Sequence, residues 1–419
     1  MIIRINKNIP NRILLILLCF LYIFYPPFTR INTLFYLGII AYIYIAFNFN
    51  SFTSFMRDGR IGNYYFILVV ANIYLCLVAL AHGSTSDIFI EPFRDFLYLG
   101  ILAVPISFFI CDEFFKSGGE AEDFIKILFI VANIQGLFAL VSFFNSRFHN
   151  WVLQNYINYG YDAERYTTLA RYRLYGLAFH LTNYSPMVVA LLIIIAFYYA
   201  RKRTSYLLYV PLMFAFVLLN SRTAIVMVIL GFLLLVITSM SNGQNMIKAA
   251  VVTMLVAIAA IISMNFIINR QDTWYGGWVK YGYDTIKSFF TGENLGYAGY
   301  IMSNSVWKIP NGFHLLTGYG NSSLYYGSLM QSDVGYIHYL WRGGLVFAFF
   351  VVLINRILIG ELVKNQDTRV LSYAIILIIA IGNVKDTIYS VDEFMMILIL
   401  LFVFSIKQEY HASLIEGDN

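Results

Sequence analysis

The sequence predicts an all-α polytopic membrane protein with about twelve transmembrane helices and two long external loops. Three observations support this fold class. Hydrophobic residues make up 60% of the 419-residue chain and charged residues only 12%, whereas roughly 25% of residues are charged in soluble domains. The apolar residues are gathered in runs that could cross a bilayer. Two polar stretches, 145–182 and 269–342, interrupt the series of runs.

Each predicted transmembrane helix corresponds to one apolar run. About 20 residues cross the roughly 30 Å hydrocarbon core of a bilayer, and somewhat shorter segments also occur. The runs cover residues 13–28, 32–48, 64–81, 93–111, 124–144, 184–200, 205–220, 223–241, 247–268, 343–361, 369–384 and 391–406. We therefore interpret the whole chain, 1–419, as a single integral membrane domain.

The distribution of Lys and Arg predicts the orientation, because short cytoplasmic loops are enriched in these residues. With twelve spans, most basic residues of the short connections fall on one side. Among them are Arg12, Arg60, Lys116, Arg203 and Lys407. We expect this side and both termini to be cytoplasmic, and the two long loops to be external.

Composition excludes several classes of function. The net charge of +5 is small for this length, so no nucleic-acid partner is expected. Cys19, Cys76 and Cys111 lie in or beside apolar runs, which indicates buried apolar thiols rather than disulfides.

The histidines form no HxH or HExxH pair, so no metal site is predicted. The chain has no GxxxxGKS/T stretch, and we expect neither ATP nor another cofactor.

Three arginines of the first long loop form the first candidate site. Arg165, Arg171 and Arg173 lie close together, with only Asp162 and Glu164 as acidic neighbours. On the external side the positive-inside rule gives no reason for such a cluster, so an anionic partner is indicated. The planar guanidinium matches phosphate oxygens, which makes a lipid-linked diphosphate the best candidate. Solvated loop charges or contacts with anionic lipid headgroups are the alternative.

Arg222 is the second candidate, because it lies at the boundary between two apolar runs. A charge at that depth is costly unless it is paired, reaches the interface or has a function. Its neighbours Asn220, Ser221 and Thr223 could help to bind a phosphate or a sugar hydroxyl. A plain membrane-edge arginine is the alternative.

The second long loop combines Gly and Asn with many aromatic residues, which is typical of a folded segment rather than a disordered one. We expect it to form a cap that supplies part of an active site. Asp333 and His338 are candidate bases for an incoming hydroxyl. In a helix their side chains would point about 140° apart. The alternatives are a helix N-cap for Asp333 and an interfacial histidine for His338.

Three segments resemble the integral-membrane O-antigen polymerases (Wzy-type) and their relatives, the O-antigen ligases. Arg165 and Gly176 match the Arg-x10-Gly pattern of some such polymerases, and NSRTA around Arg222 resembles the Ser-Arg element of the family. The stretch GYGNSSLYYGSLMQSDVGYIHYLWRGGL resembles the end of the family's large loop. As an architecture the resemblance covers essentially the whole chain, and it implies a GT-C-like fold in a bacterial inner membrane.

The resemblance implies a metal-independent glycosyltransferase that polymerises the repeat units of O-antigen or another surface polysaccharide. The glycan would move from undecaprenyl diphosphate to a sugar hydroxyl of a second lipid-linked repeat. The four arginines named above would neutralise the diphosphates, and Asp333 or His338 would deprotonate the hydroxyl. The expected partners are the undecaprenyl-diphosphate-linked oligosaccharide and membrane lipid, and a chain-length regulator is a further candidate.

The chain departs from the family in one respect. The Arg-x15-Gly pattern expected in the second loop is absent, because Arg270 and Arg342 at its edges are its only arginines. The contribution of the loop would then come from Asp333, His338, Lys308 or Arg270. Because His338 is placed like the loop histidine that ligases are thought to use as a base, transfer to lipid A core remains an alternative. Two functions outside the glycosyltransferases also stay open: a lipid-linked oligosaccharide flippase and a non-enzymatic partner of an envelope complex.

Overall fold

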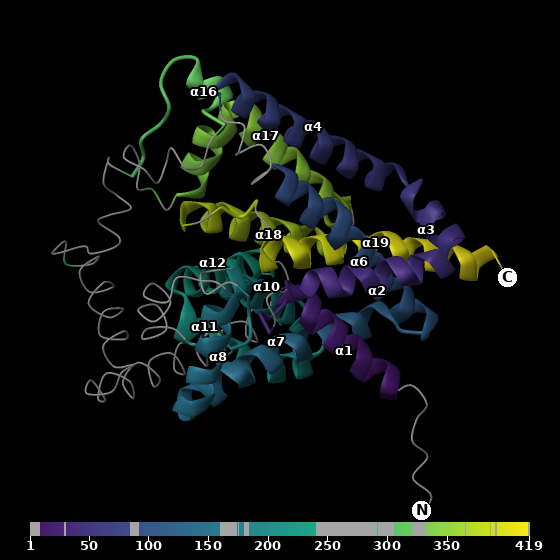
Figure 1. Cartoon of the computed structure of the whole chain (residues 1–419). Coiled ribbons are helices and arrows are strands. Elements are labelled where there is room, and N and C mark those ends of the chain that lie inside the picture. Colours follow the sequence, from purple (N-terminus) through teal and green to yellow (C-terminus); the bar gives the residue numbers. More distant parts are fainter. Residues whose placement is uncertain are drawn as a thin grey trace, which may run out of the picture.

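The structure is a computed structural model, and it is built from helices (Figure 1). It describes residues 9–28, 31–83, 92–159, 174, 176–179, 184–239, 291, 306–320, 332, 334–364, 366–385, 387–389 and 392–417. All regular secondary structure within these ranges is helical, as the sequence predicts. The predicted span 247–268 and the candidates Arg165, Arg171, Arg173 and Asp333 lie outside the described residues.

Several helices have the length and composition of membrane spans. Five are long and apolar enough to cross a membrane: Gly59–Ala81, Phe96–Lys116, Ala121–Phe144, Gly335–Gly360 and Glu393–Ser413. Shorter apolar helices cover Asn11–Ile23, Tyr184–Ala200, Thr204–Asn220 and Thr223–Thr238. A 17-residue helix is about 26 Å long, which is less than the roughly 30 Å bilayer core. Apart from 247–268, every predicted span overlaps a described helix.

The first predicted span ends earlier than expected, and the second, 32–48, is followed by a sharp bend. Helix α1 (Ile9–Ile23) stops before Pro26 and Pro27 instead of continuing to residue 28. Proline lacks a backbone N–H and disfavours helical geometry in the residue before it, which explains the early end. Helix α2 (Thr33–Phe47) is followed by α3 (Phe49–Met56) after a bend of 102°. If the two count as one broken span, the number of candidate spans rises to six.

The fourth predicted span contains a π-helical stretch. Helix η2 (Phe96–Leu102) continues directly into α6 (Ala103–Lys116), which contains Pro105. Because Pro105 has no N–H, it cannot donate to the Ile101 carbonyl four residues earlier. The Tyr42 hydroxyl of α2 donates to that carbonyl at 2.7 Å. From α4 (Gly59–Ala81), Tyr65 and Tyr64 likewise donate to the carbonyls of Gly100 and Leu99, at 2.8 and 3.2 Å. Neighbouring tyrosines thus satisfy backbone acceptors in an apolar environment.

Helix α10 (Tyr184–Ala200) lies at the centre of the molecule. Every residue from Tyr184 to Tyr198 is buried, which fits its apolar composition on all sides. Its neighbours are α7 (Ala121–Phe144), η3 (Thr204–Tyr209), α11 (Val210–Asn220), α12 (Arg222–Ser239), α18 (Gln366–Lys385) and α19 (Glu393–Gly417). Helix α8 (Ser146–Tyr159) follows α7 and opens the first long connection.

Helix α17 (Gly335–Lys364) begins earlier than the predicted span 343–361 and is broken at Gly343 and Gly344. The last residues of the predicted loop 269–342 are therefore helical, which corrects the loop boundary. Residues 335–342 are rich in polar and aromatic residues, so the search for apolar runs did not include them in the predicted span. The short helix α16 (His314–Thr317) and α4 both pack against α17 (Figure 1).

Candidate functional site

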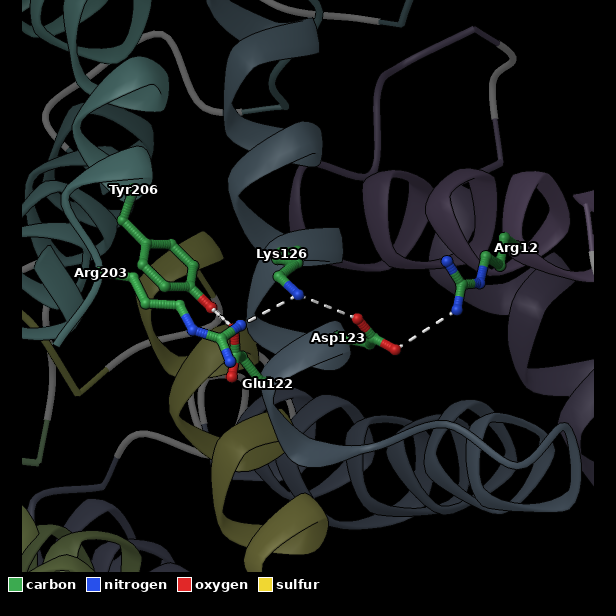
Figure 2. A network of polar contacts seen from close by, with 6 residues as sticks. All are labelled: Arg12, Glu122, Asp123, Lys126, Arg203 and Tyr206. Atoms are coloured by element: carbon green, nitrogen blue, oxygen red, sulfur yellow. Dashed lines mark hydrogen bonds and ion pairs between the residues drawn. The ribbon is translucent and has the colours of Figure 1, made fainter.

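Ion pairs concentrate at one end of the helix bundle. Figure 2 shows Glu122 of α7 accepting from Arg203 at 2.8 Å and from the Tyr206 hydroxyl at 2.5 Å. Lys126 lies between Glu122, at 3.4 Å, and Asp123, at 3.2 Å. Asp123 also accepts from Arg12 of α1 at 3.3 Å. The beginnings of α1 and α7 and the link after α10 thus meet at this end.

The C-terminal helix joins the same end. Arg60 binds Asp58 at 2.8 Å and Glu409 of α19 at 2.6 Å. The Arg60 hydrogen bonds lower the pKa of the Asp58 carboxyl. Lys407 of α19 contacts Asp112 of α6. Lys116 binds the same carboxylate at 3.0 Å, and α7 follows α6 after a short turn. Five of the basic residues that the loop charges assign to one side therefore gather at one end of the bundle, which we call the basic end: Arg12, Arg60, Lys116, Arg203 and Lys407.

The candidate site lies around the break between α11 and α12. Arg222 is the first residue of α12, and only its backbone is described. Asn220 is 1% exposed, and its Oδ1 accepts from the Leu174 N–H at 2.8 Å. The Ser221 hydroxyl accepts from the Ala224 N–H at 3.2 Å and caps the new helix. Leu174 directly follows Arg173, and Asn220 precedes Arg222 by two residues. This hydrogen bond therefore brings the backbone next to Arg173 close to the start of α12.

Residues 176–179 extend this link toward α7 and α1. The Leu177 N–H donates to Gln135 of α7 at 3.1 Å, and the Phe179 N–H donates to the Phe24 carbonyl at 2.9 Å. Gly176 has a φ of 62°. A Cβ at this position would lie 2.8 Å from the Gln135 side chain. The glycine of the Arg-x10-Gly pattern is therefore required by both backbone conformation and close packing.

His338 is half-buried in the first turns of α17. Its Nε2 lies 2.5 Å from the Ser332 carbonyl oxygen. A carbonyl only accepts, so Nε2 carries the proton, and the basic nitrogen of the neutral ring is Nδ1. The Ser332 hydroxyl in turn accepts from the Val334 N–H at 3.1 Å. These contacts fix the orientation and the tautomer of the imidazole.

The end of α18 lies between the segments that carry His338 and Arg222. Tyr339, next to His338, donates to Asn383 of α18 at 2.7 Å. On the other side, a Cβ at Gly382 would lie 3.1 Å from the side chain of Met227 in α12. Met227 is five residues from Arg222, which corresponds to about 7.5 Å along the helix. The structure therefore brings these two predicted segments to one end of the bundle.

One buried ion pair at this end was not predicted. Arg342 of α17 binds Asp95 at 2.8 Å, and the Asp95 side chain is fully buried. The sequence pattern placed Arg342 only at a loop edge. Arg94 lies farther from the carboxylate, at 3.6 Å, with its side chain 47% exposed. A carboxylate and a guanidinium in two different apolar segments are natural partners, which is the signal that could have identified the pair.

Two further features flank the candidate site. Asp392, just before α19, and Glu393, its first residue, are fully buried. Asp392 accepts from the Met395 N–H at 2.9 Å and caps the helix. In the sequence, the acidic dipeptide next to an apolar run could have identified these two residues.

A stack of four rings also joins the segment 306–320 to the ends of α4 and α17. It consists of His82, His314, Tyr319 and Trp341.

The cysteines occupy the apolar interior, as the sequence predicts for Cys19 and Cys111, which are buried. Cys76 is half-buried, and all three are free thiols. Within the described ranges, no three His, Cys, Asp or Glu side chains come together as a metal site.

No protein-family model matches this chain, and no curated protein is detectably similar to it in sequence. The resemblance to the polymerases thus rests on the short segments named above.

Proposed function

We propose that the chain is a polymerase of lipid-linked surface-polysaccharide repeat units, similar to the O-antigen polymerases. In this proposal the helices form about twelve spans of a GT-C-like fold in a bacterial inner membrane. The basic end faces the cytoplasm together with both termini, and the opposite end faces the periplasm. One observation carries the proposal: the hydrogen bond from Leu174 to Asn220 joins the arginine-rich connection to the end of α11, two residues before Arg222.

The proposed site binds diphosphate through arginines from two segments. Arg165, Arg171 and Arg173 belong to the connection that ends at Leu174, and Arg222 begins α12. The N-terminus of α12 adds the partial positive charge of its unpaired N–H groups, which favours phosphate. Neutralising the diphosphate makes it a better leaving group without a metal ion.

The proposed reaction is a direct displacement at the anomeric carbon of the donor glycan. The base, His338 or Asp333, removes the proton of an acceptor sugar hydroxyl. The acceptor oxygen forms a bond to the anomeric carbon while the bond from that carbon to the phosphate oxygen breaks. Undecaprenyl diphosphate leaves, and the glycan grows by one transfer. For His338 the basic atom would be Nδ1, because Nε2 donates to Ser332.

Complementation of a deletion strain tests this proposal through the length distribution of its glycan ladders. We expect Arg173→Ala and Arg222→Ala to abolish long ladders, and Arg222→Lys to restore them only in part, because lysine lacks the bidentate fork. Substituting the true base, by His338→Ala or Asp333→Ala, should lower the rate about a hundredfold or more. Arg201→Ala is the matched control, because Arg201 is exposed at the end of α10 next to the basic end.

Ladders of normal length from both arginine variants would contradict the diphosphate role. The deletion strain itself separates polymerase from ligase. Single repeats that remain attached to lipid A core indicate a missing polymerase. Lipid-linked polymer that never reaches the core indicates a missing ligase.

A further inference from the structure

A cavity of about 810 Å³ lies between α17 and α18. Tyr336 and Tyr339 border it before the break in α17, and the long part of α17 and the facing side of α18 supply the other walls. The Tyr336 hydroxyl donates to the Ala380 carbonyl at 2.9 Å and closes one corner. Helix α17 ends at Lys364 and α18 begins at Gln366, and the two helices pack against each other (Figure 1). The cavity is separate from the break between α11 and α12 that carries the candidate site.

The walls of this cavity are apolar and partly open. Val352 is 63% exposed and Ile376 is 47% exposed, so both would face hydrocarbon in a bilayer. Ala348, Gly360 and Ala380 have small side chains or none, which leaves room between the helices. Such a groove fits a flexible hydrocarbon chain better than a polar substrate.

One part of the groove is basic. Arg356 and Arg369 line it near the connection between α17 and α18, and both are exposed. Among the described residues that line the groove, none is acidic. Asn355 lies beside Arg356, and its buried Oδ1 has no hydrogen-bond partner in the described part of the chain. A buried acceptor without a partner is costly, so a ligand that donates a hydrogen bond would stabilise it.

The dimensions agree with a phospholipid. Asn383 lies fourteen positions after Arg369 in α18, which corresponds to about 21 Å along the helix. One leaflet contributes about 15 Å of hydrocarbon to a bilayer. A headgroup at the arginines can therefore place an acyl chain along the groove toward Asn383.

We propose that this groove binds one anionic glycerophospholipid whose headgroup carries hydroxyl groups. Its phosphate lies between Arg356 and Arg369, a headgroup hydroxyl donates to Asn355, and one acyl chain follows the groove. A polyprenyl diphosphate is the less suitable occupant, because its charged group would have to lie about 18 Å along α17 from the break at Gly344. The inference is independent of the proposed polymerase activity, and its test needs no turnover.

Native mass spectrometry of the full chain in detergent tests this site with phosphatidylglycerol and, for comparison, zwitterionic phosphatidylethanolamine. We expect the wild-type chain to retain one phosphatidylglycerol in preference to phosphatidylethanolamine. The double variant Arg356→Gln with Arg369→Gln should bind phosphatidylglycerol about twenty-five-fold more weakly, given about a fivefold contribution from each cation. Arg57→Gln is the matched control, because Arg57 is an exposed cation outside the groove.

A second variant separates loss of charge from loss of space. Gly360→Leu keeps both arginines but adds a side chain to the groove, and no atom that the structure describes lies within 4 Å of a Cβ at this position. We expect it to weaken both lipids equally. Unchanged retention of phosphatidylglycerol by the double variant would overturn the proposal. Absence of any retained lipid, or complete displacement by equimolar polyprenyl diphosphate, would also overturn it.

Discussion

Arg342 and Asp95 are 247 positions apart in the chain, yet their side chains form a 2.8 Å ion pair. The pair joins the start of α17 to the segment before η2. The Arg342 guanidinium also lies 5.1 Å from the centre of the Phe347 ring. Removing one member of a buried pair leaves the other charge without compensation, and this loss usually exceeds the net contribution of the pair.

We predict that Arg342→Met lowers the free energy of unfolding by about 3 kcal/mol, because the fully buried Asp95 carboxylate loses its nearest partner. Thermal unfolding in detergent measures the change. Adding Asp95→Asn to Arg342→Met should recover part of the loss, since the uncompensated charge is then removed.

Arg94→Met is the matched control for this prediction. Its side chain is 47% exposed and lies 3.6 Å from the same carboxylate, so we expect a loss below about 1 kcal/mol. If Arg94→Met and Arg342→Met lowered the free energy of unfolding equally, the 2.8 Å contact of Arg342 would not be the more important of the two for stability.

The break in α17 determines how the segment 306–320 packs on the helix bundle. Gly344 has a φ of 65°, and a Cβ there would lie 2.1 Å from the Leu316 carbonyl oxygen. The Tyr319 N–H donates to the Trp341 carbonyl at 2.7 Å, just before the break. The Trp341 indole donates to the Lys308 carbonyl at 2.7 Å. The cap segment and the broken helix therefore depend on each other.

Gly344→Ala should lower the free energy of unfolding by more than about 2 kcal/mol, because left-handed strain adds to a clash with backbone atoms. We also expect faster tryptic cleavage after Lys308 in the variant, as the segment 306–320 loses its place on α17. Gly62→Ala in α4 is the control, since none of the described residues has an atom within 4 Å of a Cβ there. That change should stabilise the helix by about 0.5 kcal/mol. Unchanged proteolysis of Gly344→Ala would contradict the coupling.

At the scale of elements, the sequence predicts the positions of helices better than their breaks. Long apolar runs identify α4, α7 and α19, because burial in an apolar environment determines both composition and length. The break at Gly344 and the π-helical stretch before Pro105 depend on contacts with Leu316 and with tyrosines of other helices. Such contacts join distant parts of the chain, and the hydrophobic pattern of a single apolar run cannot predict them.

At the scale of the whole molecule, the ion pairs of the basic end connect α1, α4, α6, α7 and α19. Loop charges alone predicted that Arg12, Arg60, Lys116, Arg203 and Lys407 share one side, and these five side chains lie at one end of the bundle. The compartment that this end faces stays a prediction. The sequence also indicated His338 and Arg222 as candidates, because polar groups beside apolar runs are unusual. It did not predict that Asn220 binds Leu174 or that Gly382 approaches Met227. Those contacts follow from tertiary packing, and a single sequence does not show which distant residues pack together.

The two ends should face different compartments if the proposed orientation is right. We predict that a membrane-impermeant maleimide labels Phe313→Cys in intact spheroplasts, since Phe313 is 71% exposed beside α16. Arg203→Cys at the basic end should react only after the membrane is permeabilised. Both variants are made in a chain with Cys76→Ala, because Cys76 is half-buried whereas Cys19 and Cys111 are buried. That parent chain, without an introduced cysteine, is the control.

The labelling experiment separates orientation from function. If Phe313→Cys and Arg203→Cys react from the same side, the ends of the bundle do not lie in two compartments, and the proposed external cap is excluded. If only Arg203→Cys reacts from outside, the positive-inside rule fails for this chain, and a periplasmic polymerase site is excluded as well. Labelling of Phe313→Cys alone leaves the break between α11 and α12 on the side where lipid-linked repeats would be joined.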